Sequence, residues 1–421
     1  MATAPVRRPL AAPASPISTD ATSQAVNPAG LAHVGSQVNA AFSLFSPDRK
    51  FTGGTVPGFT TTGKVDSSND IFAVPRLRHF LCPRRSVGDR FMMIGNGGMN
   101  TTYKNAAGGL IPPPNGCGGA PNFGPFCAGK AGVDLNQMIM GVTYARDMGA
   151  VSVGVTPMFA VQRFSARGLG AFAGVSNNAA SLTSGENSYS YGVGVRAGIE
   201  LEVTPRMRVG LAGQTPIWMT EFDKYKGLFA DGGDFDIPGN VTVGVAYDVT
   251  DTVTVMADWK HIFYNSVGAV GNPMGNLAAC MGGNAASCLG GSNGAGFGWK
   301  DVDAFKFGVE WNATDALTVR AGYSYNTQPV KSADVMFNIL APGVIQHHIT
   351  AGLKYDFNEQ HSIELAAAYM PVAKVSGGEM AGFGNPAHRI DLEMSQIDVT
   401  LGYVYRFGAP KAAAEPIVRK Y

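Results

Sequence analysis

Alternation of apolar and polar residues along most of the chain is the feature that most constrains this sequence. From Tyr191 to Glu202 the odd positions read Tyr, Val, Val, Ala, Ile and Leu, and the even positions read Gly, Gly, Arg, Gly, Glu and Glu. A period of two residues is typical of a strand with one apolar face, and a shift of one residue would exchange the faces. About fourteen segments have this pattern: roughly 38–46, 71–81, 91–103, 134–146, 150–164, 189–204, 207–219, 239–250, 252–265, 302–314, 317–330, 347–358, 361–373 and 396–407.

The connections between these segments differ in length in a regular way. Tight turns are expected at 146–149, 204–206, 249–251, 314–316 and 357–359, and long loops near 165–188, 220–238, 266–301, 331–346 and 374–395. Outer-membrane barrels have short turns at one end and long loops at the other, whereas a soluble β-sandwich has no reason for this asymmetry. The sequence therefore predicts an all-β fold, a transmembrane antiparallel β-barrel of about 14 strands over residues 38–407.

Composition excludes several other classes of protein. The chain of 421 residues contains 55 glycines and only 15% charged residues, and its net charge of +1 gives no electrostatic reason to bind nucleic acid. The longest apolar run, near 365–373, is far shorter than the roughly 20 residues of a membrane-spanning helix. No Gly-x-Ser-x-Gly nucleophile elbow is expected, because the one match to this pattern, at 290–294, lies in the predicted loop 266–301, and His347 and His348 have no catalytic partner motif. We expect no enzyme activity, cofactor or metal.

Four of the five cysteines fall in two close pairs, each around a glycine-rich stretch. Cys117 with Cys127, and Cys280 with Cys288, are predicted to form loop disulfides in an oxidising compartment, while Cys82 is left over. The alternative is that all of these residues are free thiols.

The predicted external loops are unusually apolar. Apolar patches on loops that face water often mark a binding surface, which here would capture apolar cargo. The alternative is that these loops fold inward and bury one another. The candidate capture residues are Leu169, Phe172, Leu228, Phe229, Phe337, Ile339 and Leu340.

Two further features of the predicted wall bear on transport. By their phase, Arg196, Lys306, Arg320 and Lys354 face the lumen, where they could contact a substrate carboxylate or could merely form ion pairs with acidic residues. The third strand contains Gly95, Asn96, Gly97 and Gly98, and glycines within a strand often mark a bulge or a break in pairing. We interpret this stretch as either a gap in the wall or a place where another backbone approaches closely.

Several stretches of the chain, which together span roughly residues 21–407, resemble the FadL/TodX (OmpP1) family of outer-membrane transporters of long-chain fatty acids and aromatic hydrocarbons. The matching stretches are 27–30 (NPAG), 95–103 (GNGGMNTTY), 221–225 (EFDKY), 235–238 (FDIP) and 337–343 (FNILAPG). The resemblance implies that the N-terminal segment, here 21–37, folds inside the barrel as a hatch carrying the motif Asn27, Pro28 and Ala29. It places this motif next to a kink in the third strand.

The resemblance also implies a function. Hydrophobic small molecules would be captured outside, enter a lumenal pocket, and leave sideways at the kink without an energy source. The protein would be a monomer in the bacterial outer membrane, with the surrounding lipid, lipopolysaccharide and the barrel assembly machinery as partners. The alternatives are a general diffusion porin for small polar solutes, and an outer-membrane enzyme or adhesin that does not transport.

Three stretches depart from this pattern. Residues 1–20 lack the apolar core of a signal peptide, and residues 75–90 hold five arginines without alternation. Both could come from a shifted reading frame or a faulty gene start; for 75–90 the alternative is a basic insertion that leaves the second strand short or missing. Residues 408–421 read as a disordered C-terminal tail of Pro, Ala and Lys, whose effect on assembly is an open question.

Overall fold

Antiparallel strands make up most of the computed structural model, which describes residues 24–67, 72–80, 90–104, 106–111 and 117–407. The strands are β1 Gln37–Gly53, β2 Gly63–Asp66, β3 Phe72–Phe80, β4 Arg90–Asn100, β5 Gly132–Asp147, β6 Val151–Arg167, β7 Ser188–Thr204, β8 Met207–Gln214, β9 Trp218–Met219, β10 Asn240–Asp248, β11 Val253–Ile262, β12 Val302–Asn312, β13 Leu317–Asn326, β14 His347–Asp356, β15 His361–Gly378 and β16 Arg389–Arg406.

The helices between the strands are short. They are η2 Pro28–His33, η3 Gly170–Val175, η4 Ala179–Ser181, η5 Asp223–Tyr225, α1 Ala230–Gly233, η6 Tyr264–Ser266, α2 Gly268–Gly271, α3 Asn276–Met281, η7 Ala285–Ser287, η8 Ser332–Asp334 and α4 Val335–Asn338. Within the described ranges, none of them is long and apolar enough to cross a membrane.

Fourteen of the described strands form the wall of a barrel, because each pairs with one strand on either side. Their order follows the chain, and β1 completes the ring by pairing with both β3 and β16. The other two strands are extensions: β2 pairs with the end of β1, and β9 pairs with β7 beyond the end of β8. The prediction of an antiparallel barrel with about fourteen strands is confirmed.

The wall carries its apolar side chains on the outside. On β7, Val193 is 59% exposed and Ile199 is 47% exposed, whereas Ser190 and Arg196 on the opposite face are buried. Such an arrangement is unfavourable in water but suits a wall that faces lipid outside and a polar lumen inside. The phase of alternation predicted for this strand is therefore confirmed.

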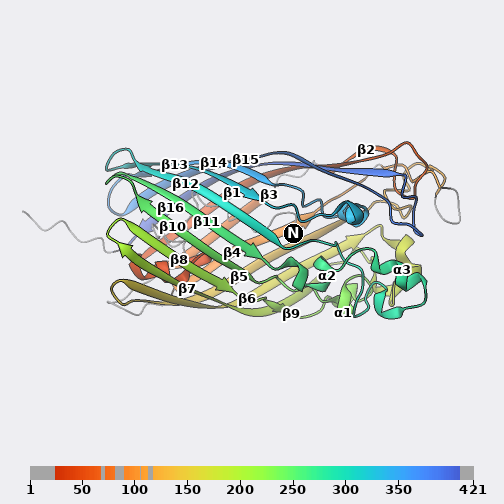
Figure 1. Ribbon diagram of the computed structural model, residues 1–421, viewed down its shortest axis with the longest axis horizontal. Coiled ribbons are helices and arrows are strands. Elements are labelled where there is room, and N and C mark those ends of the chain that lie inside the picture. The colour runs from red at the N-terminus through yellow and green to blue at the C-terminus, as the bar shows by residue number, and fades with distance from the viewer. Residues whose placement is uncertain (1–23, 68–71, 81–89, 105, 112–116, 408–421) are drawn as a thin grey trace, which may run out of the picture.

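The two ends of the barrel are built differently (Figure 1). At one end tight turns join the strands, for example between Asp147 of β5 and Val151 of β6. At the other end lie the long loops, which carry helices α1, α2 and α3. The predicted asymmetry of the connections is confirmed.

One predicted loop is wrong. The segment 374–395 is mostly strand, because β15 continues to Gly378 and β16 begins at Arg389. Here the sheet extends past the apolar belt, and its exposed face carries charges: Glu393 pairs with Lys374 at 2.5 Å and with Lys50 at 2.9 Å. Charged residues on an exposed face hide the alternation that marks a lipid-facing strand.

Some sequence expectations fall on residues outside the described ranges, namely 1–20, 408–421 and Cys82. Of the arginine-rich stretch 75–90, the structure describes 75–80 and Arg90, which belong to β3 and β4. The second strand of the wall is therefore present.

Candidate functional site

The N-terminal segment lies against the inner face of the wall, and its role as a hatch stays a prediction. We call residues 24–37 the hatch segment; its helix η2 packs against β5, β6 and β7. The Asn27 side chain caps this helix by accepting a hydrogen bond from the amide of Ala29 at 3.1 Å. The same side chain donates to the carbonyl of Ile199 on β7 at 3.0 Å, so the motif ties the helix to the wall.

Two glycines of the wall make this close approach possible. Gly154 of β6 and Gly198 of β7 are directly paired. A Cβ atom at Gly154 would lie 2.4 Å from the carbonyl carbon of Pro28, and one at Gly198 would lie 2.0 Å from Oδ1 of Asn27. Sequence reasoning missed this pair, although both glycines occupy inward positions where the alternation calls for a side chain. We call Gly154 and Gly198 the glycine dock.

The hatch segment is also held at both of its ends. Before the helix, Gln24 Nε2 lies 2.7 Å from both the carbonyl of Arg90 and the hydroxyl of Thr143. After the helix, the His33 ring lies 2.9 Å from the hydroxyl of Ser152. The motif thus contacts β6 and β7, and Gln24 reaches the start of β4, the strand in which the resemblance places the kink.

The glycine-rich stretch of β4 forms a β-bulge, and its role as a gap in the wall stays a prediction. On β4 the pairing with β5 shifts register between Gly95 and Gly97, which leaves Asn96 as an extra residue in a β-bulge. Gly97 has a φ of 153°, a conformation that side chains rarely adopt, and a Cβ there would meet no described atom within 4 Å.

Pairing on the other side of β4 is short. Within the described residues, which exclude 81–89, strands β3 and β4 share the four pairs from Leu77↔Met93 to Phe80↔Arg90. Beyond these, residues 72–76 of β3 and 94–100 of β4 are both described and do not pair with each other. We call this interruption between β3 and β4 the seam.

Of the four cations predicted to face the lumen, two form ion pairs and a third lies opposite a carboxylate. Arg320 Nε lies 2.7 Å from Glu310, and Lys354 Nζ lies 3.0 Å from Asp356. Lys306 lies opposite Asp258 in the sheet register.

Arg196 differs from these three. It is 7% exposed and donates from Nη2 to the side-chain oxygen of Gln214, while its Nη1 has no hydrogen-bond partner in the described structure. No described carboxylate forms an ion pair with it. Its neighbours on the inward face of β7 are Gly194, which packs against Ile217, and Gly198, which packs against Asn27. Arg196 therefore lies between apolar packing and the hatch segment.

The apolar loop residues are packed together at the loop end. Leu169, Phe172, Phe229, Phe337, Ile339 and Leu340 are all at most 9% exposed, and Leu228 is partly buried against them. Phe172 lies 4.8 Å from Phe383 and 5.3 Å from Phe337, ring centre to ring centre. The loops thus fold inward to form an apolar cap, which is the alternative arrangement considered for them; a role in capture stays a prediction.

The cap is tied to the strand that contains the bulge. Directly after β4, the hydroxyl of Thr101 donates to the carbonyl of Leu340 at 2.8 Å. The hydroxyl of Tyr103 donates to the carbonyl of Ile339, also at 2.8 Å. Elsewhere in the loops, burial raises the pKa of Asp234 to about 7, with a further contribution from the charge of Asp236. At neutral pH this loop is therefore less negative than a count of its carboxylates suggests.

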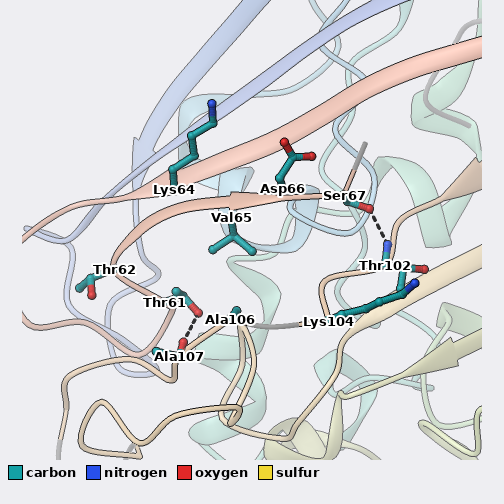
Figure 2. A pocket seen from close by; sticks show the side chains of 10 residues that line it. All are labelled: Thr61, Thr62, Lys64, Val65, Asp66, Ser67, Thr102, Lys104, Ala106 and Ala107. Atoms are coloured by element: carbon teal, nitrogen blue, oxygen red, sulfur yellow. Dashed lines mark hydrogen bonds between the residues drawn. The ribbon is translucent and has the colours of Figure 1, made fainter. Parts of the chain in front are cut away.

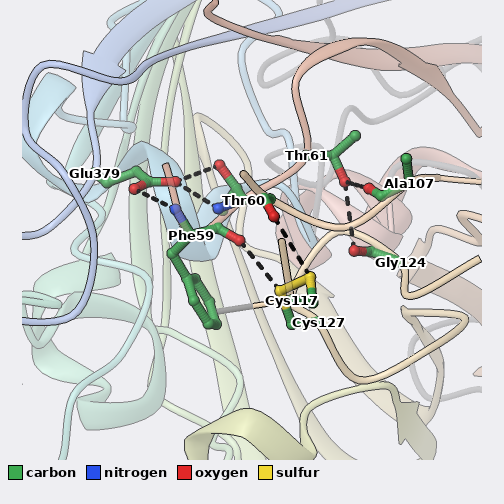
Figure 3. The surroundings of a disulfide bond; sticks show 9 residues. Phe59, Thr60, Thr61, Ala107, Cys117, Gly124, Cys127 and Glu379 are labelled. Atoms are coloured by element: carbon green, nitrogen blue, oxygen red, sulfur yellow. Dashed lines mark hydrogen bonds between the residues drawn. A yellow bond between two sulfur atoms is a disulfide. The ribbon is translucent and has the colours of Figure 1, made fainter. Parts of the chain in front are cut away.

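Both predicted disulfides are formed, Cys117 with Cys127 and Cys280 with Cys288. Beside the first, the buried carboxylate of Glu379 accepts hydrogen bonds from the amides of Phe59 and Thr60 and from the Thr60 hydroxyl (Figure 3).

A polar cavity of about 380 Å³ lies at the loop end beside β2 (Figure 2). Its lining includes Lys64, Asp66, Ser67, Thr102 and Lys104. These groups do not suit an apolar cargo. A second cavity of about 210 Å³ lies at the turn end, below the hatch segment; its lining residues are His33, Gly149, Ala150, Ser152, Glu200, Glu202 and Arg208.

The family model described as outer membrane protein transport protein (OMPP1/FadL/TodX) matches residues 135–407. The chain belongs to this family. The match covers more than half of the chain, from β5 to the end of the barrel, so the predicted FadL/TodX resemblance is confirmed. The family is one of transport proteins.

Solved structures with similar folds agree. The Pseudomonas putida toluene transporter TodX is 16% identical, with 90% of this chain and 92% of that chain covered and a TM-score of 0.64. A Pseudomonas aeruginosa FadL homologue is 15% identical, with 94% and 96% covered and a TM-score of 0.67. The Ralstonia pickettii toluene transporter TbuX is 16% identical, with 96% and 98% covered and a TM-score of 0.61.

These identities establish the FadL/TodX fold and leave the cargo open. In sequence, the Neisseria meningitidis protein NMB0088 is 27% identical over 116 residues, which is 26% of this chain. The chain spans only about a quarter, 24%, of the length of that curated relative.

Proposed function

We propose that this protein is a passive outer-membrane channel for hydrophobic small molecules that carry a carboxylate, with long-chain fatty acids as the model cargo. It acts as a monomer in a bacterial outer membrane, where lipid and lipopolysaccharide surround it after insertion by the barrel assembly machinery. It uses no cofactor or energy source. Family membership supports transport, and the named transporters of toluene and the FadL homologue support apolar cargo.

The observation that carries the choice of cargo is Arg196. A guanidinium buried without a carboxylate is costly, and a ligand carboxylate would relieve that cost with charge-assisted hydrogen bonds. Apolar packing around Ile217 lies on one side of Arg196 and the hatch segment on the other. A fatty acid would place its head group at Arg196 and its tail in the apolar cap. An uncharged hydrocarbon such as toluene would leave the arginine unpaired.

The path through the wall follows from the seam. Apolar cargo that has reached the lumen gains nothing from entering the aqueous space beyond the hatch segment, whereas a gap beside β4 leads directly to lipid. The bulge at Gly95 and Gly97 and the short β3–β4 pairing both support this lateral exit. A general diffusion porin is less well supported, because the cap and the hatch segment occupy its polar path.

The test is uptake of labelled oleate and labelled toluene by cells that lack their own transporter and express this protein or its Arg196→Gln variant. We expect oleate uptake by the wild type, and a loss of at least several-fold in the variant. Arg206→Gln, at an exposed turn outside the lumen, is the control and should behave like the wild type. Uptake of toluene in preference to oleate, or uptake of oleate that does not depend on Arg196, would contradict the assignment of cargo.

A further inference from the structure

We propose that Pro75 is the residue that keeps the seam open, so that the lateral exit is made by β3 as well as by the glycines of β4. This inference rests on the proposed function, because it concerns the residue that positions the exit. It starts from the register of the two strands, in which Leu77 faces Met93. If the same register continued for two more residues, Pro75 would lie opposite Gly95, where the bulge begins.

A proline in a strand removes one amide donor from the ladder of hydrogen bonds, and prolines are therefore rare in paired strands. In this barrel, two other strand prolines lie where pairing is disturbed on one side, whereas Pro47 of β1 pairs with Gln396 of β16 without a break. At Pro157 of β6, the pairing with β5 stops after Gly141↔Met158 and resumes at Tyr144↔Val155. At Pro371 of β15, the pairing with β16 shifts register and then continues.

Pro75 differs from these prolines in one respect. On the side of β4, pairing does not resume in the described residues 72–74 of β3, although these residues still pair with β1. The proline alone therefore does not account for the open seam, and the strand that faces it has to be considered as well.

The residues opposite provide the reason. Near Pro157, the hydroxyls of Thr143 and Thr156 lie 2.6 Å apart and bridge the two strands across the break. Opposite Pro75, the chain offers Gly95, Asn96 and Gly97. Two of these have no side chain for a cross-strand contact, and Asn96 instead donates to Gln137 of β5 at 3.0 Å. Gly95 and Gly97 offer no side chain to bridge the two strands here, and we attribute their separation to these glycines together with Pro75.

The test is the Pro75→Thr variant of the full-length protein. Threonine restores the amide donor and favours extended backbone, and it is tolerated on either face of a wall. We expect pairing to extend past Pro75, which would slow amide hydrogen exchange in residues 94–100 of the detergent-solubilised protein. Uptake of labelled oleate should fall several-fold, while binding of oleate to the protein in detergent should remain at the wild-type level.

Pro157→Thr is the matched control, because it also restores a donor in a strand but lies away from the seam. It should leave uptake and the exchange of residues 94–100 unchanged. Pro75→Thr uptake equal to that of the wild type would overturn the proposal, as would unchanged exchange at 94–100. If the wild type takes up no oleate, the proposed function fails instead. The exchange comparison then still decides whether Pro75 holds the seam open.

Discussion

Single atoms decide how deeply the hatch segment can sit in the barrel. The glycine dock places the backbone of Pro28 so close to β6 that a methyl group at position 154 would overlap its carbonyl carbon, at 2.4 Å. Backbone cannot move aside as the end of a flexible side chain can, so this contact requires glycine. The two dock glycines have the same role as the cap made by Asn27: both set the position of this short helix against the wall.

We predict that Gly154→Ala displaces the hatch segment towards the lumen. Overpacking of this kind costs about 1–3 kcal/mol, which is enough to loosen a short plug without unfolding the barrel. Single-channel conductance for small ions in planar bilayers should rise. Gly213→Ala on β8 is the control, because a Cβ atom there would lie 3.9 Å from its nearest neighbour, the carbonyl oxygen of Asn240. Equal conductance in the two variants would show that the dock does not seat the hatch segment.

At the scale of elements, the alternation in the sequence was sufficient to predict the wall, because successive residues face lipid and lumen in turn and must be apolar and polar in turn. The prediction failed where the strands extend beyond the lipid-facing belt. Strands β15 and β16 extend into water. There, charged residues such as Lys374 and Glu393, which form an ion pair, interrupt the apolar alternation, and the sequence therefore predicted a loop. The seam was predictable on the side of β4 from its glycines. The contribution of Pro75 was not, because it depends on which residues face it across the strands.

The cap could be predicted only as a set of apolar loops, since the contacts between loops join residues far apart in sequence. Glu379 shows this well. Its carboxylate, 3% exposed, accepts hydrogen bonds from Phe59, Thr60 and Asn385, and so links the loop after β1 to the loop after β15 (Figure 3).

We predict that Glu379→Gln loosens both of these loops. The amide of glutamine would turn an NH₂ group towards at least one backbone donor, and an unsatisfied buried group costs about 1–3 kcal/mol. Amide hydrogen exchange in 54–62 and 379–388 should accelerate, with the strands unaffected. Glu359→Gln, at an exposed turn, should change nothing. Unaltered exchange in both loops of the Glu379 variant would mean that the carboxylate does not hold them together.

At the scale of the whole molecule, the proposed function has two exits from the lumen to compare. One passes the hatch segment to the cavity of about 210 Å³ at the turn end, and the other passes through the seam into lipid. The chemistry of the linings separates them. Glu200, Glu202 and Arg208 line the first route, which makes it unfavourable for an alkyl chain. The seam is bordered by glycines and opens at a surface of apolar side chains.

A disulfide across the seam distinguishes these routes. We predict that Val74→Cys with Asn96→Cys, once oxidised, blocks uptake of oleate and leaves its binding in detergent intact, and that reduction restores uptake. The control is Val309→Cys with Ala321→Cys, which joins a fully paired position of β12 and β13 and shares the native disulfides. If the cargo instead leaves past the hatch segment, the seam disulfide will have no effect and Gly154→Ala will raise uptake. Loss of uptake in the oxidised seam variant thus indicates exit through the wall, and unchanged uptake in that variant indicates exit past the hatch segment, because closing the seam acts only on cargo that passes through the wall.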